Sequence, residues 1–277
     1  MFGILTDDPE LARSDIGDVT YYFTNYVDGT CQPPLDGAIS SVACWGDTAT
    51  VSDEPDRAAV AADGTRAASD VEGHHWGTVC PTDPDYRAEV LERIGRVGAA
   101  GDVRLTTLGF PGASFCHCDR CDRLFAASEF ADRNAWRTSV ITEFVADAAD
   151  CVAGDLVTTL YPDPYPGNLR ERAGLDPRAL ASAVDEFLVP LCGVSYETTY
   201  WVESLARGFA RELEGVDATV TIQLATDGID ADRLVGLTRQ LEPHAKTIVY
   251  GTHPDDEAVV REVIRRVRDA ETAPRVA

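Results

Sequence analysis

The sequence predicts a single (β/α)8 TIM barrel over residues 1–270. The chain has 277 residues, of which 44% are hydrophobic, so it can build one large core. Eight short β-rich runs occur along it, and helical patterns lie between most of them. Alternation of strands and helices implies parallel strands, and eight such units in about 250 residues are typical of a closed α/β barrel.

The eight runs are rich in β-branched and aromatic residues, which suit strands. Their spacing leaves room for a connection after each one. We expect strands over Phe2–Thr6, Val19–Val27, Ala38–Trp45, Val103–Phe110, Leu156–Pro162, Phe187–Tyr196, Thr219–Ala225 and Thr247–Thr252.

The connections have helical patterns, and Asp-Pro pairs such as Asp83-Pro84 and Asp176-Pro177 mark helix starts. The first three strands are poorly separated by helices. Residues 47–73 read as a long loop insertion, and residues 271–277 as a frayed tail. A doubly wound sheet is the alternative fold, but its glycine-rich first turn is missing. We expect helices over Pro84–Gly98, Arg120–Val152, Pro177–Asp185, Thr198–Leu213, Asp230–Leu241 and Asp255–Arg268.

The charge of the chain is strongly acidic. There are 47 acidic and 24 basic residues, a net charge of −23, and Lys246 is the only lysine. Such a dispersed acidic surface suits a cytoplasm at very high salt, where screening weakens self-repulsion. It argues against nucleic-acid binding, which needs a basic surface. The N-terminus has no secretory signal and no apolar run is long enough for a membrane span, so we expect a halophilic, cytoplasmic protein with no membrane partner.

Three cysteines are concentrated in the stretch Cys116-x-Cys118-x2-Cys121, and Cys80 precedes the helix that leads into the fourth strand. One strand–helix excursion can bring the two segments together. Four thiolates then form the tetrahedral shell of a structural zinc. The alternatives are four reduced thiols without metal, or His117 in place of one cysteine. A redox pair is less favoured because no thioredoxin-like βαβ unit follows.

The other four cysteines are scattered along the chain. In a reducing cytoplasm they are not expected to form a disulfide framework. We expect them to be small buried hydrophobic residues, namely Cys31, Cys44, Cys151 and Cys192.

The segments "VCPTDPDYR" and "FCHCDRCDRLFAAS" resemble the zinc-binding segments of family 42 glycoside hydrolases, the zinc-bearing β-galactosidases. The resemblance covers about Trp76–Phe130. It implies a glycosidase-type barrel with a structural zinc beside the carbohydrate-binding face. The chain departs from that family at the end of the fourth strand. The family has an Asn-Glu pair there, whose glutamate is the acid/base, whereas "DVRLTTLGFPG" has no carboxylate after Asp102.

The strand ends hold carboxylates and aromatic rings, and barrel enzymes keep their chemistry at the C-terminal ends of their strands. Glycoside hydrolysis needs two carboxyl groups that flank the bond. The catalytic candidates are Glu197, Asp163 and Asp227. Rings that stack on sugars and amides that bind hydroxyls are the expected substrate-binding groups, namely Trp45, Trp76, Tyr161, Tyr165, Tyr196, Tyr200, Trp201 and Gln223.

Three functions remain open at this point. The favoured one is hydrolysis of a soluble glycoside, with a small carbohydrate as the substrate and zinc in a structural role. A non-catalytic sugar-binding barrel and a zinc-dependent transferase or hydrolase are the alternatives. Several candidates also have a structural interpretation: Asp163 suits an Asx turn, Asp8 a helix cap, and His253-Pro254 the start of the last helix. The sequence does not decide whether the chain forms a homo-oligomer.

Overall fold

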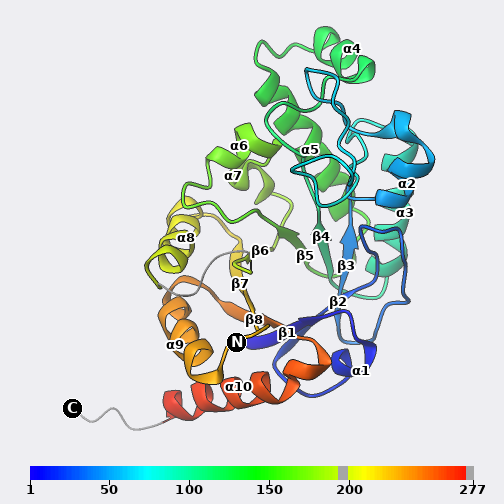
Figure 1. The fold of residues 1–277 in the computed structure, drawn as a ribbon. Helices are drawn as coiled ribbons and strands as arrows, with labels where there is room; N and C mark the ends of the chain where they lie inside the picture. Colours follow the sequence, from blue (N-terminus) through cyan, green and yellow to red (C-terminus); the bar gives the residue numbers. More distant parts are fainter. Residues whose placement is uncertain (193–198, 273–277) are drawn as a thin grey trace.

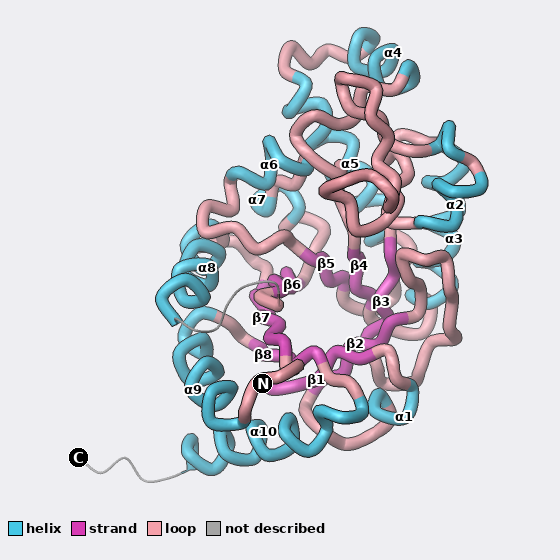
Figure 2. Tube along the Cα trace, in the orientation of Figure 1, coloured by secondary structure: helices cyan, strands magenta, loops and turns pink. Residues whose placement is uncertain are grey.

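The computed structural model describes residues 1–192 and 199–272. Its eight parallel strands close into a barrel in sequence order, as predicted. Helices surround the ring of strands (Figures 1 and 2). The strands are β1 (Phe2–Thr6), β2 (Val19–Phe23), β3 (Ile39–Ala43), β4 (Val103–Thr106), β5 (Leu156–Thr159), β6 (Glu186–Pro190), β7 (Thr219–Ala225) and β8 (Thr247–Gly251).

Several strands end before the predicted boundary. β2 ends at Phe23 and β4 at Thr106, so the residues that follow them belong to the loops at the C-terminal mouth of the barrel. A small apolar cluster fills the barrel interior, and a second, larger cluster lies between the strands and the helices. The interior cluster comprises Leu5, Tyr21, Val157, Leu188 and Val249, with Val19, Phe23 and Ile39 packed against it.

Most connections contain a helix that buries one apolar face against the strands. Between β2 and β3 the described chain has no helix, which agrees with the weak helical signal there. The helices are α1 (Pro9–Ala12), α2 (Thr48–Asp53), α3 (Pro84–Gly98), α4 (Asp119–Ala127), α5 (Arg133–Ala149), α6 (Asn168–Ala173), α7 (Pro177–Leu180), α8 (Thr199–Glu212), α9 (Ala231–Leu241) and α10 (Glu257–Thr272), with 3-10 turns η1 (Pro55–Arg57), η2 (Glu242–His244) and η3 (Pro254–Asp256).

The helix predicted over Arg120–Val152 is in fact two helices, α4 and α5. α4 ends at the C-cap Ser128, which adopts an extended conformation. Asp132 begins α5, because its carboxylate accepts hydrogen bonds from the N–H groups of Asn134 and Ala135. This N-cap accounts for the break.

Residues 47–73 were predicted to form a long loop, but α2 and η1 lie within them. Asp47 caps α2 by accepting a hydrogen bond from the Thr50 N–H. The rest of the excursion is held by isolated β-bridges, including those of Ala58 with Val79 and of Ala61 with Phe115. Together with α4, this excursion lies at the edge of the molecule farthest from α10 (Figure 1).

The C-terminal helix α10 continues to Thr272, past the start of the predicted frayed tail at residue 271. Residues 273–277 lie outside the described part of the chain. Within the described ranges, no helix has both the length and the apolar character that a membrane span needs.

Candidate active-site cleft and metal centre

The four predicted metal ligands come together beside α4. The Cys80 Sγ lies 3.6 Å from that of Cys116, 3.7 Å from that of Cys118 and 3.4 Å from that of Cys121. All four sulfur atoms lie within 4.8 Å of one another. A tetrahedral zinc with Zn–S bonds of about 2.3 Å separates its sulfurs by about 3.8 Å. The cluster therefore fits a four-thiolate metal site, as predicted.

Backbone donors surround the sulfur atoms. The Val60 N–H donates to the Cys116 Sγ (3.3 Å) and the Cys121 N–H to the Cys118 Sγ (3.5 Å). The neighbouring thiols, that of Cys116 first, lower the pKa of Cys118 by hydrogen bonding to its sulfur. Such donors stabilise thiolates, the form that binds metal. The His117 ring lies 3.6 Å from the Asp122 carboxylate and is not part of the cluster, in agreement with four cysteine ligands.

The cysteine cluster is joined to the mouth of the barrel through Phe115. This ring is next to Cys116 in the chain and contacts His74 edge to face, with ring centroids 5.5 Å apart. His74 belongs to a segment that also contains Trp76 and lines a pocket at the mouth. A metal in the cluster would therefore fix one wall of that pocket.

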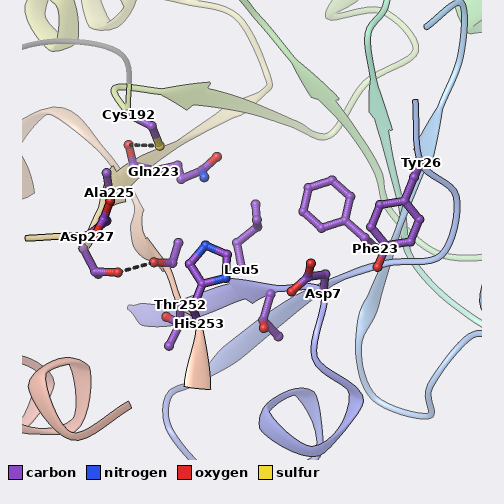
Figure 3. Close-up of a pocket in the computed structure, with 13 residues that line it drawn as sticks. Leu5, Asp7, Phe23, Tyr26, Cys192, Gln223, Ala225, Asp227, Thr252 and His253 are labelled. Atoms are coloured by element: carbon purple, nitrogen blue, oxygen red, sulfur yellow. Dashed lines mark hydrogen bonds between the residues drawn. The ribbon is translucent and has the colours of Figure 1, made fainter. Parts of the chain in front are cut away.

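Two pockets lie at the C-terminal mouth. The first, about 390 Å³, is formed by residues at the ends of β1, β2, β7 and β8 and by residues that follow these strands and β6. Its polar groups include the exposed carboxylates of Asp7 and Asp227, the His253 imidazole and the Gln223 amide. Figure 3 shows the His253 ring between the two aspartates in that view.

The second pocket, about 620 Å³, lies over the ends of β4, β5 and β6 and is closed on one side by residues 73–78. Trp76, Tyr161 and Arg172 line it, and the Arg172 guanidinium carbon lies 5.6 Å from the centre of the Tyr161 ring. Cys192 lines both pockets. We refer to the two pockets together as the cleft.

Four of the predicted site residues line the cleft: Trp76, Tyr161, Gln223 and Asp227. Two others, Tyr196 and Glu197, lie outside the described residues. Exposed rings at Tyr165, Tyr200 and Trp201 line neither pocket.

Trp45 does not contact the cleft, contrary to prediction. Its side chain is fully buried between the strands and the helices. The ring packs against Phe144 of α5 and Tyr86 of α3, with centroids 4.6 and 6.3 Å away. The residue lies two positions beyond Ala43, where β3 ends. Trp45 is therefore a core residue.

Asp163 forms a local turn. Its carboxylate accepts hydrogen bonds from the Tyr165 N–H (2.7 Å) and from the Asn168 side-chain amide (3.5 Å). It lines neither pocket of the cleft. The Asx-turn interpretation of this residue is therefore the one that the geometry favours.

The predictions missed several cleft residues. Asp7, which directly follows β1, is not among the catalytic candidates, and His253 was expected at the start of a helix. Phe23, the last residue of β2, and Tyr26, which follows that strand, also line the first pocket. Their position at or after the end of a predicted strand could have identified them, because the chosen candidates were selected on the same ground.

The scattered cysteines are not all buried. Only Cys44 is buried as predicted, whereas Cys31 and Cys192 are exposed and Cys151 is half-buried. Loss of hydration nevertheless raises the pKa of the Cys192 thiol to about 11, and the nearby charge of Arg104 opposes that rise. Cys192 differs from the prediction because β6 ends at Pro190, which leaves the cysteine at the mouth.

Arg104, the second residue of β4, lies in the barrel interior. Its guanidinium carbon lies 5.0 Å from the ring centre of Phe23 and 5.7 Å from that of Tyr21. The residue is 3% exposed. Burial lowers the pKa of Arg104 to about 10, which leaves it charged at neutral pH.

The end of β4 has no carboxylate, as the sequence indicated. Thr107 and Gly109 line the cleft there. Thr107 has a left-handed φ of 47°, and its hydroxyl accepts a hydrogen bond from the Gly46 N–H (3.1 Å). The cleft wall at the end of β4 therefore carries a hydroxyl in place of a carboxylate.

Comparison of the sequence with protein families and with curated proteins finds no match. Solved structures do match the fold. An α-L-fucosidase isoenzyme 2 from Paenibacillus thiaminolyticus superposes with a TM-score of 0.67 at 12% identity, over 92% of this chain and 44% of that one. This chain thus spans less than half of the fucosidase.

Two further enzymes match over nearly their whole length. Bee venom hyaluronidase has a TM-score of 0.52 at 12% identity and covers 98% of this chain and 97% of its own. A chitinase from Chromobacterium violaceum has a TM-score of 0.51 at 9% identity and covers 95% and 98%. At these identities the likeness is one of fold, and it does not single out family 42. The chain is a (β/α)8 barrel whose structural neighbours are glycoside hydrolases.

Proposed function

We propose that the chain hydrolyses a soluble glycoside in the cleft at the C-terminal mouth of its barrel. The observation that carries this proposal is the convergence of Asp7, Asp227, His253 and Gln223 on one pocket. Aromatic rings extend the cleft on both sides, and rings with a few polar groups are what a sugar site requires. The fold of the neighbouring glycoside hydrolases agrees with it.

The chemistry needs a proton donor for the leaving oxygen and a second carboxylate as base or nucleophile. Asp227 follows β7 and Asp7 follows β1, so the two approach the first pocket from different strands. We assign them as the catalytic pair. Glu197, in the connection after β6, stays a candidate from the sequence. Asp163 is the weakest, since its carboxylate is used in a turn.

We propose a structural role for zinc in the cysteine cluster. Four thiolates fill a tetrahedral shell, whereas a catalytic zinc keeps one position open. The cluster lies beside α4, and its link to the cleft runs through Phe115 and His74. This arrangement disfavours a transferase or hydrolase that uses the cysteine-bound metal.

Sugar binding without hydrolysis is the second candidate. The absence of a carboxylate at the end of β4 favours it, because that is where family 42 has its acid/base. The two candidates differ in a single observable, which is release of reducing sugar.

The test is a panel of α- and β-linked aryl glycosides and oligosaccharides at high potassium chloride. The wild type is compared with the double variant Asp7→Asn/Asp227→Asn, which keeps the size of both side chains. Hydrolysis by the wild type and its loss in the variant would support the proposal. Retained hydrolysis in the variant would remove the pair from the mechanism, and binding without hydrolysis would favour the second candidate.

A further inference from the structure

Arg104 is a buried cation for which no counter-charge is found in the described structure. Its Nε and Nη1 atoms are shielded from solvent and have no hydrogen-bond partner. No ion pair to Arg104 occurs among residues 1–192 and 199–272. A buried charge without a partner costs several kcal/mol, so an arginine kept there calls for another explanation.

The other buried arginine shows what a structural role looks like. Arg137 is 1% exposed, and its guanidinium donates to the carbonyls of Gly112 (2.7 Å) and Glu171 (2.8 Å). In the barrel interior, Glu186 could have neutralised Arg104. Its two oxygens instead accept hydrogen bonds from the hydroxyls of Tyr21 and Thr219. Beside its guanidinium lie the rings of Phe23 and Tyr21, and the described residues offer it no ion pair.

The guanidinium leans toward the mouth of the barrel. It is nearer to Phe23, at the end of β2, than to Tyr21, which lies lower in the barrel. It also affects the charge state of Cys192, which follows β6. Phe23 and Cys192 both line the first pocket. Arg104 itself lines neither pocket, so its positive charge lies in the barrel interior, behind the Phe23 ring that lines the first pocket.

We propose that Arg104 binds a carboxylate of the substrate, so that the cleft takes an acidic sugar of the hexuronic type. This inference rests on the proposed function, whose substrate class it names. A planar guanidinium matches a carboxylate better than a hydroxyl, and a desolvated one discriminates strongly. The exposed carboxylates of Asp7 and Asp227 repel an anion at the rim. A carboxylate held by the buried Arg104 would lie deeper in the barrel than the exposed aspartates, which would leave the glycosidic bond near them.

The experiment is calorimetric titration of the full-length protein with D-glucuronate and with D-glucose at the same potassium chloride concentration. Wild type is compared with Arg104→Met and Arg104→Lys. Arg172→Met is the matched control, because Arg172 lines the other pocket of the cleft. We expect glucuronate to bind more tightly than glucose, and Arg104→Met to weaken glucuronate about 10- to 100-fold with little effect on glucose. Arg104→Lys should fall between the two.

Thermal unfolding without ligand gives an independent readout. Replacing an unpaired buried charge by an apolar side chain is often neutral or stabilising. We therefore expect Arg104→Met to unfold at the same or a higher temperature than the wild type. A marked fall in unfolding temperature for both Arg104 variants, with glucuronate no tighter than glucose in the wild type, would make Arg104 structural and overturn the proposal.

The remaining outcomes separate this inference from the proposed function. Glucuronate binding that depends on Arg104, without hydrolysis of any glycoside, would support the inference and contradict the hydrolase. Hydrolysis of neutral glycosides that Arg104→Met leaves unchanged would support the hydrolase and contradict the inference about Arg104. If chloride displaces glucuronate from Arg104 as well as glucuronate displaces chloride, Arg104 is a site for inorganic anions, and the acidic-sugar assignment is overturned. Loss of glucuronate binding in Arg172→Met alone would also overturn it.

Discussion

At the scale of single residues, choosing side chains near the C-terminal ends of the predicted strands identified part of the candidate site. Gln223, near the end of β7, and Asp227, just after it, both reach the cleft. The same reasoning failed for Trp45, which follows β3 but packs against Tyr86 of α3 and Phe144 of α5. The sequence could not identify Arg104 as a site residue. What distinguishes it is a buried guanidinium with unpaired nitrogen atoms, and a sequence does not show hydrogen-bond partners.

Trp45 and Trp76 provide a matched pair, because both were predicted to bind sugar and only Trp76 lines the cleft. Trp45→Ala removes a fully buried ring and should lower the free energy of unfolding by about 3–5 kcal/mol. Trp76→Ala should change it by less than about 1 kcal/mol and raise the KM of any substrate found. Chemical denaturation at fixed salt measures the first effect. Equal losses of stability in the two variants would contradict the assignment.

Cys192 gives a prediction for pH dependence. Because loss of hydration raises the pKa of its thiol to about 11, the reactive thiolate is scarce at neutral pH. Its alkylation rate should rise about tenfold per pH unit until the pH approaches that value. Arg104→Met removes a charge that lowers this pKa, so alkylation at a given pH should slow. Peptide mass spectrometry after iodoacetamide labelling reports the rate, and a plateau at neutral pH would contradict the shift.

At the scale of elements, the sequence predicted all eight strands and placed most helices, because parallel strands and amphipathic helices have strong periodic patterns. It placed boundaries less well. The break between α4 and α5 depends on the side-chain cap of Asp132, a local hydrogen bond within a continuous helical pattern. The pairing of the Cys80 segment with α4 was predicted because the spacing of metal ligands is itself a strong signal.

The metal centre should stabilise the segments that hold its ligands, residues 58–80 and 115–127, more than the strands of the barrel. Cys118→Ser, or chelation of the wild type, should reduce bound zinc from about one ion per chain and speed amide exchange in residues 58–80 and 115–127. Exchange in β5 to β8 should stay slow. Cys44→Ser, at a buried cysteine outside the cluster, is the control and should keep its zinc. Uniformly faster exchange across the barrel after chelation would contradict a local role.

At the scale of the whole molecule, the fold leaves the acidic surface facing solvent. The net charge of −23 repels itself, and salt reduces that repulsion. We therefore expect the unfolding temperature to fall as potassium chloride is lowered from about 3 M to about 0.2 M. Scanning calorimetry measures it, with an uncharged osmolyte at low salt as the control for general stabilisation. An unfolding temperature independent of salt would contradict adaptation of the acidic surface to high salt.

The central claim is that glycosides are hydrolysed at the pocket that contains Asp227. The most direct measurement is kcat/KM for Asp227→Asn beside Asp163→Asn, on the best substrate of the glycoside panel. Asp163 is a suitable control because its carboxylate serves a turn outside the cleft. We predict a loss of about 10²–10⁴-fold for Asp227→Asn and little change for Asp163→Asn. Full activity of Asp227→Asn, or an equal loss in Asp163→Asn, would contradict the account.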